Sequence, residues 1–277
     1  MTVLRRVFYA LPPSWRFFVR RLFFLPRDLL RPQRSKNGVL IPPKGLIYTG
    51  SGDFLKQGET WLRHFIEKGQ LSAHHQVLDV GSGIGRIAIP LTDYLNEKGG
   101  YEGFDVVKLG VDWCQKHISN QYPNFRFQYI PIDNDLYRSE GLQAANYHFP
   151  YADEQFDFVI LTSVFTHMLP AEVENYLAEI HRVLKSGGRC MATFFIWNEE
   201  AAQLSPSNPK FQFPYDHGHY RLMDEKVKSA NVAFDASYLK SYLNQVGLQL
   251  ENTFPGFWCG RPKAESLDFQ DVLLLQK

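Results

Sequence analysis

The sequence predicts an α/β protein with a doubly wound sheet of seven strands whose last strand is antiparallel. Short apolar segments alternate with helical segments from about residue 55 onward, as in such sheets. The sequence VLDVGSGIGR at residues 77–86 joins the first of these strands to a helix through a glycine-rich loop, and loops of this kind bind nucleotides. Only the loop GRPKAESL separates the last two strands, so they should pair antiparallel, because a parallel return needs a crossover.

The chain begins with a basic, aromatic segment that we expect to form an arm or lid at residues 1–54. Within it, residues 14–25 (SWRFFVRRLFFL) fit a short helix, with Ser14 as its N-cap and Pro26 as its end. Proline-rich sequence follows this helix. The main domain is then expected at residues 55–277.

The main domain should open with a helix from about residue 53 to Gly69. We expect strands at 76–80, 101–105, 125–130, 156–162, 189–196, about 248–258 and 269–276, and helices at 85–97, 108–121, 170–185 and 236–246. Residues 132–150 and 197–235 interrupt the alternation. Both follow the carboxyl end of a strand, where open α/β sheets bind ligands, and we expect the second of them to be a lid insertion.

The charge of the chain is unevenly distributed. Residues 1–36 hold nine of the 30 Lys and Arg residues and one acid, a net charge of +8, and the remainder carries 21 basic and 28 acidic residues, or −7. Proteins that read nucleic acids spread basic residues over the binding face. We therefore expect a small-molecule partner and no nucleic acid, and the sequence leaves the oligomeric state open.

Three scattered cysteines without a CxxC pair indicate neither a disulfide framework nor structural zinc. Reduced thiols in the cytoplasm are the simplest interpretation. No apolar run approaches the roughly 20 residues that span a bilayer. Arginines interrupt the N-terminal aromatic stretch, so we expect no signal peptide.

The glycine loop has the pattern D-x-G-x-G-x-G from Asp79 to Gly85. In a dinucleotide-binding fingerprint the third glycine stands where this chain has Arg86, which counts against an NAD-dependent oxidoreductase, the main alternative. Asp105 ends the next strand, and its carboxylate can accept two hydrogen bonds from ribose hydroxyls. NAD sites share such an acid, so Asp105 alone does not separate the two classes.

Four segments in this order resemble the class I S-adenosylmethionine (SAM)-dependent methyltransferases: VLDVGSGIGR (77–86), YEGFDVV (101–107), FPYADEQFDFVILTSVFTHM (149–168) and EIHRVLKSGGRCMATFF (179–195). With the final antiparallel strand they cover roughly residues 55–277, and the ordered set indicates more than the glycine loop alone. The resemblance implies a Rossmann-like sheet, SAM as cofactor and S-adenosylhomocysteine as product.

The resemblance also implies which residues bind the cofactor. Asp79 and the glycine loop would hold the methionine part, and Asp105 the ribose. The family often has an acid after the third strand, near adenine; here Pro131 stands there, so Asp133 is carried over in its place. The full implied set is Asp79, Gly81, Ser82, Gly83, Gly85, Arg86, Asp105, Val106, Asp133, Asn134, Thr162 and Ser163.

The residues after the fourth strand bear on the methyl acceptor. Amino-methyltransferases of nucleic acids usually carry N/D-P-P-Y/F there, where this chain has Leu161-Thr162-Ser163-Val164, and no cysteine follows a proline as cytosine C5 enzymes require. A small molecule remains, with a hydroxyl favoured. The overall likeness is to bacterial O-methyltransferases of natural-product biosynthesis, including polyketide–peptide pathways.

An alcohol acceptor must lose its proton, for which a base contributes on the order of 10²–10⁴-fold. His167, just after the fourth strand, is the first candidate, and its alternative is a histidine that packs under the next helix. Asp216, His217 and His219, in the sequence FPYDHGHYRLMD, are further candidates, with ordinary turn residues as the alternative. A metal site on these three is a minor alternative without further ligands, and we expect no metal.

The aromatic arm allows three interpretations. As a lid it would close a hydrophobic acceptor pocket, as an interfacial helix it would lie on anionic lipid, and otherwise it would pack on the body or on a partner subunit. The candidate substrate-lining residues are Trp15, Phe18, Tyr48, Trp197, Tyr215 and Tyr220. A non-catalytic SAM-binding or membrane-associated protein is the remaining alternative; it would keep the glycine loop and Asp105 but lack a base.

Overall fold

The computed structural model describes residues 13–30, 33–48, 50, 52–132 and 141–277. The side chains of residues 13–18, 27, 29 and 30 are not described either. The predicted adenine contacts Asp133 and Asn134, and the side chains of Trp15 and Phe18, therefore lie outside the described residues.

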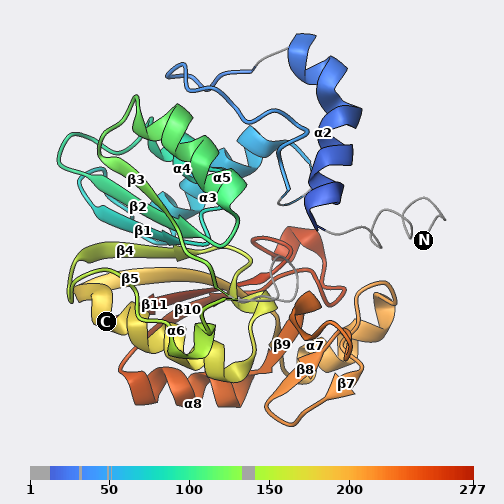
Figure 1. Cartoon of the computed structure of the whole chain (residues 1–277). Helices are drawn as coiled ribbons and strands as arrows, with labels where there is room; N and C mark the ends of the chain where they lie inside the picture. Colours follow the sequence, from blue (N-terminus) through green and yellow to red (C-terminus); the bar gives the residue numbers. More distant parts are fainter. Residues whose placement is uncertain (1–12, 31–32, 49, 51, 133–140) are drawn as a thin grey trace.

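A seven-stranded sheet forms the centre of the molecule, as predicted, in the order β10-β11-β5-β4-β1-β2-β3 (Figure 1). The strands are β1 (Gln76–Val80), β2 (Gly100–Asp105), β3 (Phe125–Tyr129), β4 (Phe156–Leu161), β5 (Leu184–Phe194), β10 (Gln249–Phe254) and β11 (Asp271–Gln276). β11 runs antiparallel to both of its neighbours, β5 and β10, and the pairs among β5, β4, β1, β2 and β3 are parallel. The predicted doubly wound sheet with an antiparallel last strand is confirmed.

Helices cover both faces of this sheet (Figure 1). α3 (Phe54–Glu67), α4 (Ala88–Leu91) and α5 (Lys108–Cys114) lie on one side, and α6 (Pro170–Val183) and α8 (Ala236–Val246) lie on the other. A hydrophobic core lies on each face of the sheet, and successive residues of β1 contribute to different cores. Val77 packs with Trp61 and Phe65 of α3, whereas Leu78 packs with Ile180 of α6. This double burial explains why the central strands are mostly apolar.

Most predicted helices are confirmed, and α3 begins where Asp53 accepts a hydrogen bond from the Lys56 N–H. The predicted helix at 108–121 is α5 continued by a short π-helix, Gln115–Ser119. The predicted helix at 85–97 is wrong, because only Ala88–Leu91 is helical. Pro90 has no N–H to donate to the carbonyl of Arg86, which disturbs the first turn.

The arm contains α2 (Pro13–Leu30), which starts before Ser14 and runs through Pro26. The predictions that Ser14 caps this helix and that Pro26 ends it are therefore wrong. Its last turn is tied to the following segment, since the Asp28 carboxylate accepts hydrogen bonds from backbone N–H groups at residues 44 and 45. Beyond α2, Val39 and Ile41 are buried in the core beneath α3.

The segment predicted as a lid insertion at 197–235 forms a small second sheet in the order β6-β9-β8-β7. Its strands are β6 (Ile196–Trp197), β7 (Tyr215–Asp216), β8 (Tyr220–Leu222) and β9 (Val232–Asp235), with α7 (Glu199–Leu204) between the first two. A third core around Phe195, Phe213 and Trp258 holds this segment against the chain near β11. Strands this short have no sequence pattern of their own, so the second sheet was not predicted.

Candidate active site

The glycine loop after β1 presents bare backbone. Gly81, Gly83 and Gly85 have φ angles of +82°, +58° and +84°, a left-handed region that glycine adopts without strain. A Cβ at Gly81 would lie 2.5 Å from Cγ2 of Val164, and one at Gly85 would lie 2.9 Å from Cδ1 of Ile118. Side chains are thus excluded from both ends of the loop, which allows a ligand to approach the backbone closely.

A cavity of about 310 Å³ opens beside this loop, at the carboxyl ends of β1, β2 and β4. Cofactor pockets typically start near this size. The predicted site residues that line it are Tyr48, Gly81, Ser82, Gly83, Arg86, Asp105, Val106, Thr162, Ser163 and His167. Asp79 and Gly85 are not among its lining residues. A second cavity of about 350 Å³, next to α3, shares Arg86 and Ser163 with it.

Asp105 joins the end of β2 to the glycine loop. Its carboxylate accepts hydrogen bonds from the N–H of Gly83 and the N–H of Val107, each at 2.8 Å. Burial raises the pKa of Asp105 to about 6, and hydrogen bonds from Val107, Gly83 and Tyr48 act in the opposite direction. Tyr48, which we expected to face the substrate, therefore lies beside this acid at the edge of the cavity.

Asp79 lies behind the loop and is fully buried. The Tyr101 hydroxyl donates to its Oδ2 at 2.6 Å, whereas Oδ1 has no hydrogen-bond partner among the described residues. Burial raises the pKa of Asp79 to about 7, against the hydrogen bond from Tyr101. A buried carboxyl oxygen without a donor is costly, and a donor from a bound ligand would remove that cost.

His167 ends a short 3₁₀ helix, Phe165–His167, between β4 and α6, and lines the cavity. Its Nδ1 lies 2.9 Å from the carbonyl oxygen of Ser229. A carbonyl only accepts, so Nδ1 carries the proton and Nε2 is left as a proton acceptor in the neutral ring. Burial lowers the pKa of His167, against the backbone of Ser229 and Ala230, so the ring is neutral at pH 7.

The other candidate bases lie on the hairpin of β7 and β8, and none of them lines this cavity. The His217 ring stacks on Tyr220 and the His219 ring on Tyr238, each with centroids 4.9 Å apart. Asp216 forms an ion pair with Arg221. Among the described residues, no group of three or more His, Cys, Asp or Glu side chains could hold a metal ion.

Three predicted substrate residues, Trp197, Tyr215 and Tyr220, also lie on the second sheet and do not line the cavity. The guanidinium of Arg221 covers the Trp197 ring at 4.5 Å. The expectation that these aromatic residues line the cavity is not met, because the strands that carry them pair in the second sheet, away from the cavity lining.

Sequence reasoning missed several cavity residues on the opposite wall. Glu172 and Tyr176 line it from the first two turns of α6, Met168 from the loop before α6, and Phe104 and Ile132 from the β2 and β3 side. Positions 172 and 176 are four residues apart, a spacing that places side chains on one face of a helix. That spacing next to the fourth-strand motif was a usable signal.

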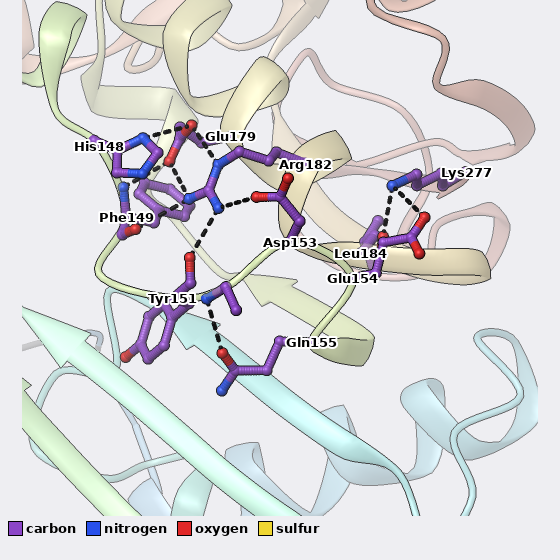
Figure 2. Close-up of polar contacts among 11 residues, drawn as sticks. His148, Phe149, Tyr151, Asp153, Glu154, Gln155, Glu179, Arg182, Leu184 and Lys277 are labelled. Atoms are coloured by element: carbon purple, nitrogen blue, oxygen red, sulfur yellow. Dashed lines mark hydrogen bonds and ion pairs between the residues drawn. The ribbon is translucent and has the colours of Figure 1, made fainter.

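The side chain of Arg182, on α6, braces the chain segment that precedes β4 (Figure 2). Its guanidinium pairs with the carboxylate of Glu179 at 2.7 Å and with Asp153 at 2.8 Å, and donates to the backbone carbonyls of Phe149 and Tyr151. The Glu179 carboxylate also accepts the Phe149 N–H. Three parts of the segment before β4 are thus fixed to α6.

Arg182→Ala should lower the free energy of unfolding by about 3 kcal/mol, because it removes the guanidinium partner of the largely buried Glu179 carboxylate. The side chains of Arg182 and Glu179 are 20% and 10% exposed. Urea unfolding measures the change. Lys108→Ala is the matched control, since Lys108 and Asp112 are exposed and such pairs contribute up to about 1 kcal/mol. Equal losses for both variants would contradict the assigned role of Arg182.

Comparison with known proteins adds to this geometry. A family model described as a methyltransferase domain matches residues 78–192. The chain is 31% identical over 139 residues to the methyltransferase GfsG of Streptomyces halstedii, covering 48% of this chain and 42% of that protein. It is 31% identical over 113 residues to the arsenite methyltransferase of Mus musculus, covering 41% of this chain and 28% of that protein. The chain thus spans less than half of either relative.

A solved structure, the PH0226 protein from Pyrococcus horikoshii OT3, superposes with a TM-score of 0.58 at 15% identity, over 83% of this chain and 94% of that one. At this identity the likeness concerns the fold alone. The family match falls on most of the strands and loops that build the cavity, and residues 78–192 therefore carry a methyltransferase domain, in agreement with the resemblance to class I SAM-dependent enzymes. SAM is the cofactor of this domain.

Proposed function

We propose that the protein transfers a methyl group from SAM to a hydroxyl of a small, hydrophobic or amphiphilic metabolite, with His167 as general base. The observation that carries the proposal is the state of His167: a buried, neutral ring on the cavity wall whose Nδ1–H is held by Ser229. This leaves Nε2 to take a proton from an acceptor hydroxyl. A histidine that served only to pack would not need to line the cavity.

The residues present fit the cofactor. The bare glycine loop allows close approach of a ligand, and the Asp105 carboxylate, on the cavity wall, is the acceptor that we propose for the ribose hydroxyls. The unpartnered Oδ1 of Asp79 supports the assignment of the methionine part to this loop. Bound SAM supplies an already activated methyl group, so the protein needs mainly to align the acceptor and remove its proton.

The lining supports an acceptor with a large apolar part. Phe104, Ile132, Val164 and Met168 contribute apolar surface, and a few polar groups among such residues usually fix orientation. Glu172 is one such polar group on this wall. We further propose that the acceptor is a natural product.

We also propose a cytoplasmic protein. All three cysteines are free and buried, which supports a reducing compartment. Among the described helices, none is long and apolar enough to cross a membrane.

Cofactor binding should weaken in acid. The pKa values of Asp105 and Asp79 are raised to about 6 and about 7, and ligand donors favour the ionised carboxylates. Affinity for S-adenosylhomocysteine should therefore be constant above about pH 8. Below pH 6, the protonation of Asp105 alone should lower it about tenfold per pH unit. Calorimetric titrations from pH 5 to 8 measure this. Asp105→Asn should bind weakly and keep only the part of the pH dependence that Asp79 contributes; an unchanged profile in this variant would refute the assignment.

A further inference from the structure

Helix α2 turns large apolar side chains to solvent. Val19, Leu22, Phe23 and Leu25 are 39%, 53%, 77% and 42% exposed. Elsewhere in the described chain only four large hydrophobic side chains are comparably exposed, and they are widely separated in the sequence: Leu142, Tyr215, Val227 and Leu250. Several exposed apolar residues on one helix mark a surface that contacts something else.

The side of α2 that faces the body is held by polar contacts. Nε of Arg20 donates to the carbonyl of Lys44 at 3.4 Å, and the Asp28 carboxylate accepts the N–H groups of Lys44 and Gly45 at 2.8 and 2.9 Å. The Lys44 ammonium lies 5.4 Å from the centre of the Phe24 ring. A surface helix usually buries its apolar face against the core, whereas α2 exposes most of its described apolar side chains at the rim of the molecule (Figure 1).

The positive charge around the exposed apolar side chains of α2 favours one kind of partner. Residues 1–36 carry a net charge of +8, and Arg20 and Arg21 lie next to the exposed apolar residues of α2. A contact between two copies through this face would bring two such segments together and repel them. Each basic residue near an anionic lipid surface raises the affinity of a protein for that surface about fivefold. Such a surface also accepts apolar side chains between its headgroups.

The dimensions fit a helix that lies on a membrane. α2 has 18 residues and is roughly 27 Å long, and no described helix could cross a bilayer. The part of the arm that follows α2 contributes Tyr48 and Gly50 to the wall of the cofactor cavity. A bilayer contact at α2 would therefore lie on the segment that leads to the site.

We propose that α2 binds the surface of an anionic phospholipid bilayer, with Leu22 and Phe23 inserted among the lipids and Arg21 at the headgroups. This contact is independent of methyl transfer, because its readout needs neither cofactor nor acceptor.

The test is flotation of the full chain with phosphatidylcholine vesicles, with and without phosphatidylglycerol. The protein should float with the anionic vesicles only, and high salt should release it. The double substitution Leu22→Gln with Phe23→Gln should weaken binding at least about tenfold, and Arg21→Gln about fivefold. Leu250→Gln, at an exposed apolar position on β10, is the matched control and should bind like the unmodified protein.

Absent binding to anionic vesicles, or binding that the Leu22 and Phe23 substitutions leave unchanged, would overturn the proposal. A dimer in gel filtration that these substitutions dissociate, without vesicle binding, would assign the face to a second copy instead. Thermal unfolding checks that each variant folds. Arg21→Gln provides an independent result if the double variant does not fold.

Discussion

Asp105→Ala should lower the affinity for S-adenosylhomocysteine by at least about 100-fold, because two hydrogen bonds to a charged group are lost together. The carboxylate also holds the Gly83 and Val107 N–H groups, so the loop loses its brace at the same time. Isothermal titration calorimetry at pH 8, where the unmodified carboxylate is ionised, measures the effect.

The control for this substitution is Asp112→Ala, a nearby acid on α5 that pairs with Lys108 on the surface. It should leave the affinity unchanged. A loss of less than about threefold for Asp105→Ala, a fraction of one hydrogen bond, would remove Asp105 from the proposed cofactor site. Asp105→Asn helps to separate the ligand contact from the brace, since its amide oxygen can still accept one N–H.

His167→Ala should lower the turnover number about 10²–10⁴-fold, the usual contribution of a general base, with little change in affinity for S-adenosylhomocysteine. The imidazole is held in the required tautomer by Ser229. An acceptor screen that follows S-adenosylhomocysteine release from hydroxyl-bearing small molecules supplies the assay. The rate of the unmodified enzyme should also fall in acid, as protonation of Nε2 removes the base.

His219→Ala is the matched histidine control, since His219 stacks on Tyr238 away from the cavity. Its turnover should stay within about twofold of the unmodified enzyme. Unchanged turnover in His167→Ala would refute the base assignment, and a large loss in His219→Ala would return the hairpin to the catalytic candidates. A protein that binds the cofactor but turns over no acceptor in the screen would favour the non-catalytic alternative.

The central sheet was predictable because its signals are local and strong. After Gln76, β1 is apolar apart from Asp79, because both of its faces are buried. Between the last two strands the chain has only a short 3₁₀ helix, Lys263–Glu265, and not the helix of a crossover. Nine of the ten predicted residues at the cavity meet there because the carboxyl ends of parallel strands share one edge of the sheet, and Tyr48 of the arm is the tenth.

The errors arose where long-range contacts override local sequence. Pro26 was expected to end a helix that continues to Leu30, where Asp28 is anchored to residues outside the helix. Trp197, Tyr215 and Tyr220 were expected to line the cavity, but they lie on short strands that pair with each other in the second sheet. Glu172 of α6 lines the cavity together with Phe104 of β2 and Ile132 from beyond β3, a meeting that no single segment specifies.

The central claim is that this cavity binds SAM, and a calorimetric titration of the full chain with S-adenosylhomocysteine tests it most directly, with NAD⁺ and NADH titrated alongside. We expect micromolar binding of S-adenosylhomocysteine that Asp105→Ala abolishes, and no binding of either nicotinamide cofactor. No binding of S-adenosylhomocysteine together with clear binding of NADH would contradict the claim and every site assignment that depends on it.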